Sequence, residues 1–173
     1  MLNKTSFIMN KNYILIVLSS VTVLIAAISC NKTNEFEAAE QQEIQDYLDR
    51  NSSLNFEKKE SGLYYLELVP GTGRVPVKYD TAYVKYTGKF LDGQIFDTNV
   101  GTTKTLEVLI GTPGIIQGFN EGLTYMASGG KSLILVPSSL GYGTTGNYYG
   151  GISGYTPLLF EIQLVQVKPG KGN

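Results

Sequence analysis

The segment from Val84 to Asp97 is the part of the chain that most constrains its fold. It reads V-K-Y-T-G-K-F-L-D-G-Q-I-F-D. Apolar and polar residues alternate at its start, as in a half-buried strand. Leu91-Asp92-Gly93 is typical of a turn, and the segment ends on the aromatic Phe96 and the carboxylate of Asp97. The segment therefore predicts a strand and a turn, followed by an aromatic ring next to an acid.

The inventory of reactive side chains limits the chemistry. The 173 residues include no His and one Cys, which excludes histidine-based catalysis and His/Cys metal sites. We therefore expect no metal and no cofactor, and an enzyme made of these residues must act by surrounding its substrate. The formal net charge is −1, which argues against a nucleic-acid surface.

Residues 1–29 have the composition of an export signal. Lys4 and Lys11 form a positive region, and Tyr13–Ile28 is a mostly apolar run of 16 residues. A membrane-spanning helix needs about 20 apolar residues, so this run is short for one. Ala27-Ile28-Ser29-Cys30 resembles the lipobox of bacterial lipoproteins, with small residues before a cysteine.

The lipobox pattern predicts cleavage before Cys30 and lipidation of its thiol. A lone cysteine supports this reading, because an unpaired thiol is disfavoured in an oxidising compartment. The protein would then be anchored by lipid in the bacterial cell envelope, on the periplasmic or outer-membrane side. An uncleaved N-terminal anchor and an ordinary signal peptide with a stray cysteine are the alternatives.

The remaining chain divides into three regions. We expect residues 30–61 to form a lipidated tether and an amphipathic helix over Glu35–Arg50, residues 62–168 to form a domain, and residues 169–173 to form a flexible tail. The helix either packs on the domain or spaces it from the membrane, or else it serves in dimerisation, and one helix of this length favours the first two roles. Its expected apolar face consists of Phe36, Ala39, Ile44, Tyr47 and Leu48.

The domain is predicted to be α+β, with a curved antiparallel sheet wrapped around one short helix and preceded by the N-terminal helix. The helix is expected over Gly118–Met126, as the only helical stretch in the domain. A Gly- and Tyr-rich loop is expected over Gly141–Tyr155. The strands are expected at Leu63–Leu68, from Asp80 through Thr87, and at Thr105–Ile110, Lys131–Val136 and Leu158–Val167.

Four segments in a fixed order carry a family resemblance. They are Val84–Asp97, Gly111–Leu123, Val136–Gly143 and Thr156–Ile162. In this order and spacing, residues 62–168 resemble the FKBP-type peptidyl-prolyl cis-trans isomerases. The resemblance implies a catalytic pocket made of Tyr86, Phe96, Asp97, Ile116, Phe119, Tyr142 and Phe160. It also implies that the Ile116 backbone N–H and the Tyr142 hydroxyl donate to ligand carbonyls, whereas Asp97 faces ligand hydroxyls.

The chain departs from the family around this pocket. Phe119 stands where Trp is common, which predicts a reshaped floor, and Ser153-Gly154 replaces a frequent Pro-Pro. Leu106 and Val108 replace aromatics of better-known members, which thins one wall. The residues expected to contact substrate around the catalytic set are Leu106, Val108, Ile115, Ile152, Tyr148 and Tyr149.

Three functions remain open at this stage. The first is an envelope prolyl isomerase acting on proline-containing unfolded or exported polypeptides, with macrolide-type inhibitors as implied ligands. The second is a weakly active or inactive chaperone or binding lipoprotein that serves an envelope machine such as gliding motility. A purely structural lipoprotein is the least favoured, because it would not need the pocket residues.

Overall fold

The computed structural model describes residues 34–171 of the protein. The predicted signal segment, Cys30 and the last two residues of the predicted tail lie outside this range. The chain divides into two compact units, residues 1–39 and residues 40–173. Residues 34–50 are helical, so this helix begins in the first unit and ends in the second. Within residues 34–171, no helix combines the length and the apolar character needed to cross a bilayer.

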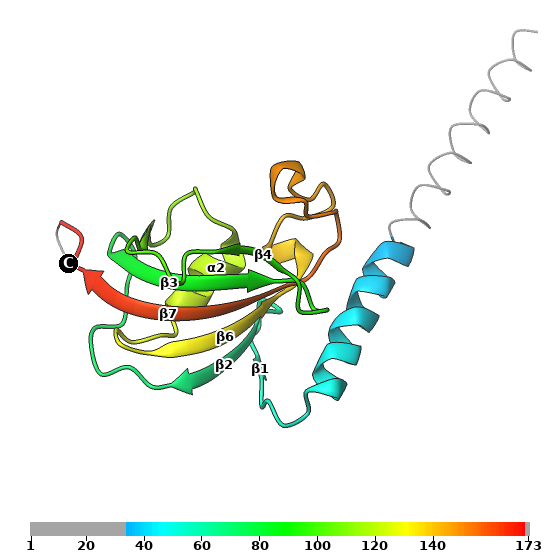
Figure 1. The fold of residues 1–173 in the computed structure, drawn as a ribbon, viewed down its shortest axis with the longest axis horizontal. Helices are drawn as coiled ribbons and strands as arrows, with labels where there is room; N and C mark the ends of the chain where they lie inside the picture. Colours follow the sequence, from blue (N-terminus) through cyan, green and yellow to red (C-terminus); the bar gives the residue numbers. More distant parts are fainter. Residues whose placement is uncertain (1–33, 172–173) are drawn as a thin grey trace, which may run out of the picture. The chain divides into compact units, whose positions relative to one another are not determined.

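The second unit is built on one antiparallel sheet of seven strands. They lie in the order β1-β2-β6-β7-β3-β4, and β5 pairs with β3. Figure 1 shows β2, β6, β7 and β3 side by side, curving over the helix α2. The strand bounds are Glu57–Lys58 (β1), Tyr64–Val69 (β2), Thr81–Lys89 (β3), Ile95–Thr98 (β4), Leu106–Leu109 (β5), Lys131–Val136 (β6) and Leu158–Lys168 (β7).

Alternation along the strands separates two apolar clusters, one on each face of the sheet. In β6, Ile134 and Val136 belong to the main core, whereas Leu135 between them belongs to the second cluster. Successive side chains of a strand point to opposite faces, so a run of buried apolar residues supplies both clusters. The sheet is therefore covered on both sides in this region.

Helix α2, Gln117–Leu123, lies on the side of the main core. Its Phe119 and Leu123 are fully buried there. Gly118 lets the helix approach the sheet closely, because a Cβ atom at this position would lie 2.5 Å from Cγ1 of Val136. This close approach fixes the position of Phe119, which follows Gly118 directly.

The second cluster holds the part of the N-terminal helix that lies in the second unit against the other face of the sheet. Ile44 and Tyr47 are buried against Leu135 and Leu159. Of the apolar face expected from the sequence, the residues within the second unit thus pack on the domain. Phe36 and Ala39, which lie in the first unit, are exposed.

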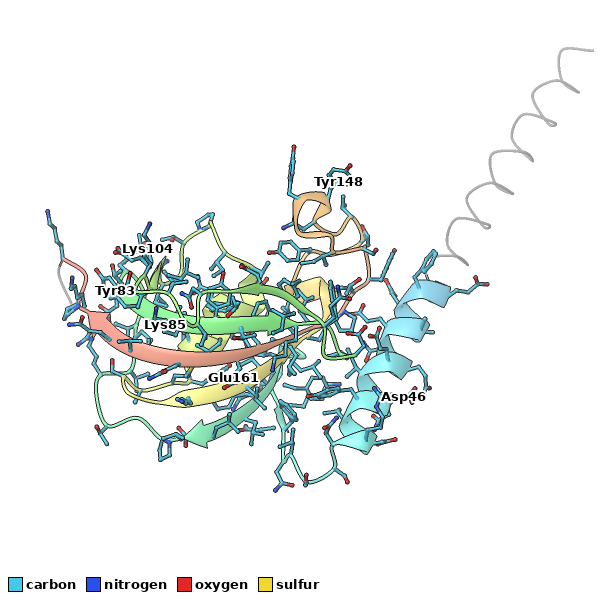
Figure 2. All side chains as sticks on the ribbon, viewed as in Figure 1. Asp46, Tyr83, Lys85, Lys104, Tyr148 and Glu161 are labelled. Atoms are coloured by element: carbon cyan, nitrogen blue, oxygen red, sulfur yellow. The ribbon has the colours of Figure 1, made fainter. Side chains whose placement is uncertain are left out.

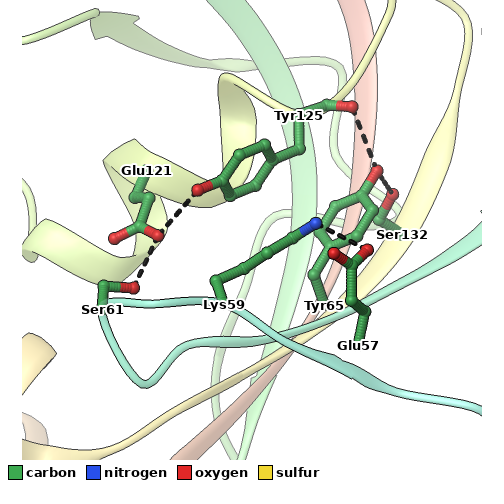
Figure 3. A network of polar contacts seen from close by, with 7 residues as sticks. All are labelled: Glu57, Lys59, Ser61, Tyr65, Glu121, Tyr125 and Ser132. Atoms are coloured by element: carbon green, nitrogen blue, oxygen red, sulfur yellow. Dashed lines mark hydrogen bonds and ion pairs between the residues drawn. The ribbon is translucent and has the colours of Figure 1, made fainter.

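A polar network fastens the C-terminal half of α2 to the β1–β2 side of the sheet (Figure 3). The Glu121 carboxylate accepts hydrogen bonds from Ser61 Oγ at 2.7 Å and from the Tyr125 hydroxyl at 3.0 Å. The Tyr65 hydroxyl donates to the Tyr125 carbonyl at 3.3 Å and accepts from Ser132 Oγ at 2.9 Å. The helix is therefore held by hydrogen bonds at one end and by core packing along its length.

Asp80 forms a buried polar anchor at the start of β3. Its side chain is fully buried and pairs with Arg74, with Nε at 2.8 Å and Nη2 at 3.3 Å from the two carboxylate oxygens. The carboxylate also accepts from the backbone N–H groups of Val77 at 3.1 Å and Gly170 at 3.0 Å. One acid thus ties the loop before β3 to the chain that follows β7.

The predicted fold class, an α+β domain with a curved sheet around a short helix, is confirmed. The prediction of a single helical stretch over Gly118–Met126 was wrong in detail. The α-helix is Gln117–Leu123, and two 3-10 turns, Ser138–Leu140 and Tyr148–Gly150, occur later in the domain. Turns of three residues show no hydrophobic period, so the sequence pattern does not reveal them.

Candidate active site

A small cavity of about 70 Å³ opens between α2 and the sheet. All seven residues expected in the catalytic set line it, together with two of the residues expected to contact substrate. They are Tyr86, Phe96, Asp97, Leu106, Ile115, Ile116, Phe119, Tyr142 and Phe160. These residues come from β3, β4, β5, β7, α2 and its entry, and the loop after β6, so the cavity exists only in the assembled fold.

The apolar wall is a chain of perpendicular aromatic rings. Phe119, which is 1% exposed, meets Tyr86 with ring centroids 5.7 Å apart and Phe160 at 5.2 Å. Phe160 in turn meets Phe96 at 5.7 Å and 90°. Edge-to-face contacts of this kind are favourable and orient each ring by its neighbours. The cavity wall is therefore fixed in position rather than loosely filled.

The register of the sheet brings these rings together. Gly88 in β3 lies opposite Phe160 of β7 on one side and opposite Asp97 of β4 on the other. A Cβ atom on Gly88 would lie only 2.5 Å from Phe96 Cζ and 3.0 Å from Phe160 Cε1. The absence of a side chain at Gly88 is what allows the two phenylalanines to meet above the strand.

The polar part of the cavity contains a phenol–carboxylate pair. The Tyr86 hydroxyl donates to Asp97 Oδ2 at 2.5 Å. Burial, the hydrogen bond to Asp97 and the charge of Asp97 together raise the pKa of Tyr86 well above its ordinary range. The phenol therefore stays protonated at neutral pH and acts as a donor. The sequence does not reveal this hydrogen bond, because the two residues lie on different strands.

Ile116 immediately precedes the first residue of α2, with φ −58° and ψ 145°. The first N–H groups of an α-helix have no acceptor within the helix, so the entry to α2 presents backbone donors. Ile116 and Ile115 both line the cavity. This position suits the carbonyl-binding role that the resemblance implies for the Ile116 N–H.

The other residues expected to contact substrate lie outside the cavity wall. Val108 and Ile152 are each 4% exposed and belong to the main core. Tyr148 and Tyr149 are 93% and 99% exposed, and their rings pair with each other at 5.8 Å. Tyr148 projects from the tip of its loop (Figure 2). A contact of these four residues with substrate stays a prediction.

A wider groove adjoins the cavity along β5. It has a volume of about 350 Å³ and is lined by residues 106–109 and 112–115. Leu106 and Ile115 line both the groove and the cavity. Among the residues that the structure describes, no three acidic, His or Cys side chains gather in a way that could hold a metal ion.

Comparisons with known proteins agree with this geometry. A family model described as FKBP-type peptidyl-prolyl cis-trans isomerase matches residues 73–165. The chain is 34% identical over 122 residues to the FKBP-type 22 kDa peptidyl-prolyl cis-trans isomerase of Escherichia coli, covering 70% of this chain and 58% of that protein. It therefore spans a little over half the length of that relative.

A shorter relative is covered almost completely. The chain is 35% identical over 106 residues to an FK506-binding protein of Neisseria meningitidis, covering 61% of this chain and 96% of the relative. Among solved structures, a peptidyl-prolyl cis-trans isomerase of Pseudomonas syringae superposes with a TM-score of 0.65 at 31% identity, covering 77% of this chain and 96% of that one. The chain belongs to the family of FKBP-type peptidyl-prolyl cis-trans isomerases.

Proposed function

We propose that this protein accelerates cis–trans isomerisation of Xaa-Pro bonds in exported polypeptides. The observation that carries the proposal is the cavity of perpendicular aromatic rings with the Tyr86–Asp97 pair at its polar side. Membership of the isomerase family supports it. Such a cavity holds a prolyl ring without needing a nucleophile or a general base.

The physical basis is a difference in polarity between the planar and the twisted amide. Resonance gives the amide bond a rotation barrier of about 18–20 kcal/mol and places partial charge on the carbonyl oxygen. Water stabilises that planar, polar form. The twisted form loses the resonance and the charge, so an apolar aromatic cavity favours it relative to the planar form. Differential binding of the twisted amide then lowers the barrier.

The polar groups have distinct proposed roles. The Ile116 N–H and the Tyr142 hydroxyl hold carbonyl groups of the substrate on either side of the prolyl ring. Asp97 accepts from Tyr86 and thereby orients the phenol at the cavity wall. Because Tyr86 stays protonated and donates to Asp97, the pair keeps one fixed arrangement at the polar side of the cavity at neutral pH.

The proposed location is the bacterial cell envelope, with a lipid on Cys30 as the anchor. Support comes from residues 1–30, which combine two lysines, an apolar run and small residues before a cysteine. Multiple acyl chains would make the anchoring stable, since a single chain binds membranes only marginally. The substrates would then be polypeptides that have crossed the inner membrane.

A second candidate function is binding of unfolded polypeptides with little catalysis, in the service of an envelope machine. The exposed pair Tyr148–Tyr149 favours it, because paired exposed aromatics offer an amphipathic contact surface. FK506-type macrolides are proposed as ligands of the same cavity, as the name of the Neisseria relative states for that protein. Leu106 would give them a smaller wall than an aromatic residue.

The test is the exchange rate of a short Xaa-Pro peptide, measured by NMR with wild-type protein, Tyr142→Phe and Asp97→Asn. We expect Tyr142→Phe to lower kcat/KM by about tenfold, which corresponds to one hydrogen bond of about 1.4 kcal/mol. Tyr83→Phe is the matched control, because Tyr83 lies on β3 outside the cavity lining (Figure 2). Wild-type rates in both cavity variants would refute the assigned site.

A further inference from the structure

Glu40 is a buried carboxylate in the N-terminal helix, outside residues 73–165 that the family model covers. It is 6% exposed, although the three residues after it are exposed. Its Oε1 accepts the backbone N–H of Ser138 at 2.5 Å, and its Oε2 accepts the Ser138 hydroxyl at 2.6 Å. Both carboxylate oxygens are therefore used on a single residue 98 positions later in the chain.

The carbonyl oxygen of Ser138 connects the Glu40 contact to the backbone of the cavity wall. That oxygen accepts the N–H of Gly141 at 2.9 Å and the N–H of Gly143 at 2.8 Å. These two residues flank Tyr142, which lines the cavity. Two successive hydrogen-bonded steps thus connect Glu40 to the backbone on both sides of Tyr142.

The helix itself is fixed to the strand that leads into this loop. Ile44 and Tyr47 follow Glu40 by four and seven positions, so all three share one face of the helix. Ile44 is 1% exposed and packs in the same cluster as Leu135, three residues before Ser138. The position of the Glu40 carboxylate next to Ser138 is therefore fixed by the packing of the helix. Hydrogen bonds to a charged acceptor are also stronger than those between neutral groups.

We propose that Glu40 is a positioning residue of the isomerase site, which holds Ser138 and through it the backbone that carries Tyr142. The inference rests on the proposed function for its catalytic consequence. It also assigns a task to the N-terminal helix: this helix completes the isomerase site from outside the segment that defines the family. Glu40 itself touches neither the cavity nor a substrate.

The test is a double-mutant cycle on the full-length protein, with Glu40→Ala, Tyr142→Phe and both together. Because a small misplacement of a positioned group lowers a rate strongly, we expect Glu40→Ala to lower kcat/KM by about tenfold. Glu40→Gln keeps one carbonyl acceptor and should lower kcat/KM by a smaller factor. In the double variant, Glu40→Ala should add no further loss, because its effect passes through the Tyr142 hydroxyl.

A control and a second readout separate positioning from a general loss of folding. Asp46→Ala, on an exposed position of the same helix (Figure 2), should leave activity unchanged. Hydrogen exchange of the Gly141 and Gly143 amides should become faster in Glu40→Ala, whereas amides of the β3–β7 ladder should not change. Ser138→Ala, which removes only the hydroxyl donor, replaces Glu40→Ala if that variant fails to fold.

The outcomes are distinct. Wild-type activity and wild-type exchange in the folded variants would overturn the inference, as would a full tenfold loss that persists on the Tyr142→Phe background. If the wild-type protein does not accelerate proline isomerisation at all, the proposed function fails. Faster exchange of Gly141 and Gly143 in Glu40→Ala would still establish that Glu40 holds this loop.

Discussion

Gly88 offers the sharpest perturbation of the cavity, because a single methyl group placed there meets two of its rings. In Gly88→Ala the new Cβ would lie 2.5 Å and 2.8 Å from Phe96 Cζ and Cε2, and 3.0 Å from Phe160 Cε1. Gly88 has no positive φ, so alanine fits the backbone and the effect comes from the rings alone. The substitution therefore acts on packing at the cavity.

The two contributions to stability have opposite signs. Replacing glycine by alanine within a regular element stabilises it by roughly 0.5–1 kcal/mol, because the unfolded chain loses freedom. Overpacking a filled site costs about 1–3 kcal/mol. We expect Gly88→Ala to lower the free energy of unfolding by about 1–2 kcal/mol, measured by chemical denaturation.

The effect on activity should exceed the effect on stability. Phe160 is 4% exposed in the central strand β7, whereas Phe96 is less buried and lies on the short strand β4. Phe96 should therefore move and break its edge-to-face contact with Phe160. A displaced wall residue should lower kcat/KM for an Xaa-Pro peptide by at least about tenfold.

Gly150→Ala is the matched control, because its Cβ would meet neighbours only at 3.4 Å or more and the residue is exposed. It should leave both the free energy of unfolding and the isomerisation rate near their wild-type values. A Gly88→Ala protein with wild-type activity would refute the reasoning that the ring contacts above Gly88 shape the catalytic cavity.

Three further predictions concern single charges. Asp80→Ala should lower the free energy of unfolding by about 3 kcal/mol in chemical denaturation, because it removes a buried carboxylate that pairs with the partly exposed Arg74 and leaves two backbone donors unmatched; a loss below about 1 kcal/mol would contradict this. Burial and neighbouring carboxylates raise the pKa of Glu43, so the wild-type protein loses stability as pH rises from 4.5 through this raised value. Glu43→Gln should therefore be more stable than wild type at pH 7 and equal to it well below pH 4.5. Equal stability of the two proteins at both pH values would contradict a raised pKa of Glu43. Asp97→Asn should lower the pKa of Tyr86, while burial keeps this pKa above 10. The titration is followed by tyrosinate absorbance, with Tyr86→Phe identifying the signal of Tyr86. An unchanged pKa would contradict the hydrogen bond to Asp97.

Much of the fold was predictable, because its long strands place apolar residues over enough positions for the pattern to be recognised. β3 begins with alternating buried residues, Ala82 and Val84, and β6 ends in a continuous buried apolar run, Ile134–Val136. β1 has two residues and β4 has only Phe96 partly buried among exposed neighbours, so neither carries a periodic signal. These short strands form because longer neighbours offer them an edge to pair with.

The gathering of the seven residues expected in the catalytic set was predictable, whereas their contacts with one another were not. The seven residues implied by the family resemblance do gather around one cavity. The Tyr86–Asp97 hydrogen bond and the Glu40–Ser138 contact depend on how distant elements pack. Glu40 sits among exposed polar residues, so the sequence places it on the solvent side of an amphipathic helix. Only the position of the loop after β6 makes it a buried acceptor.

We propose that the aromatic cavity accelerates rotation about Xaa-Pro bonds without acid–base chemistry. The most direct test of this proposal is the cis–trans exchange rate of short Xaa-Pro peptides, measured by NMR with and without the protein for several Xaa residues. We expect an acceleration that disappears in Tyr142→Ala. A folded protein that accelerates exchange for none of these peptides would rule out the isomerase function and would favour the binding function centred on Tyr148 and Tyr149.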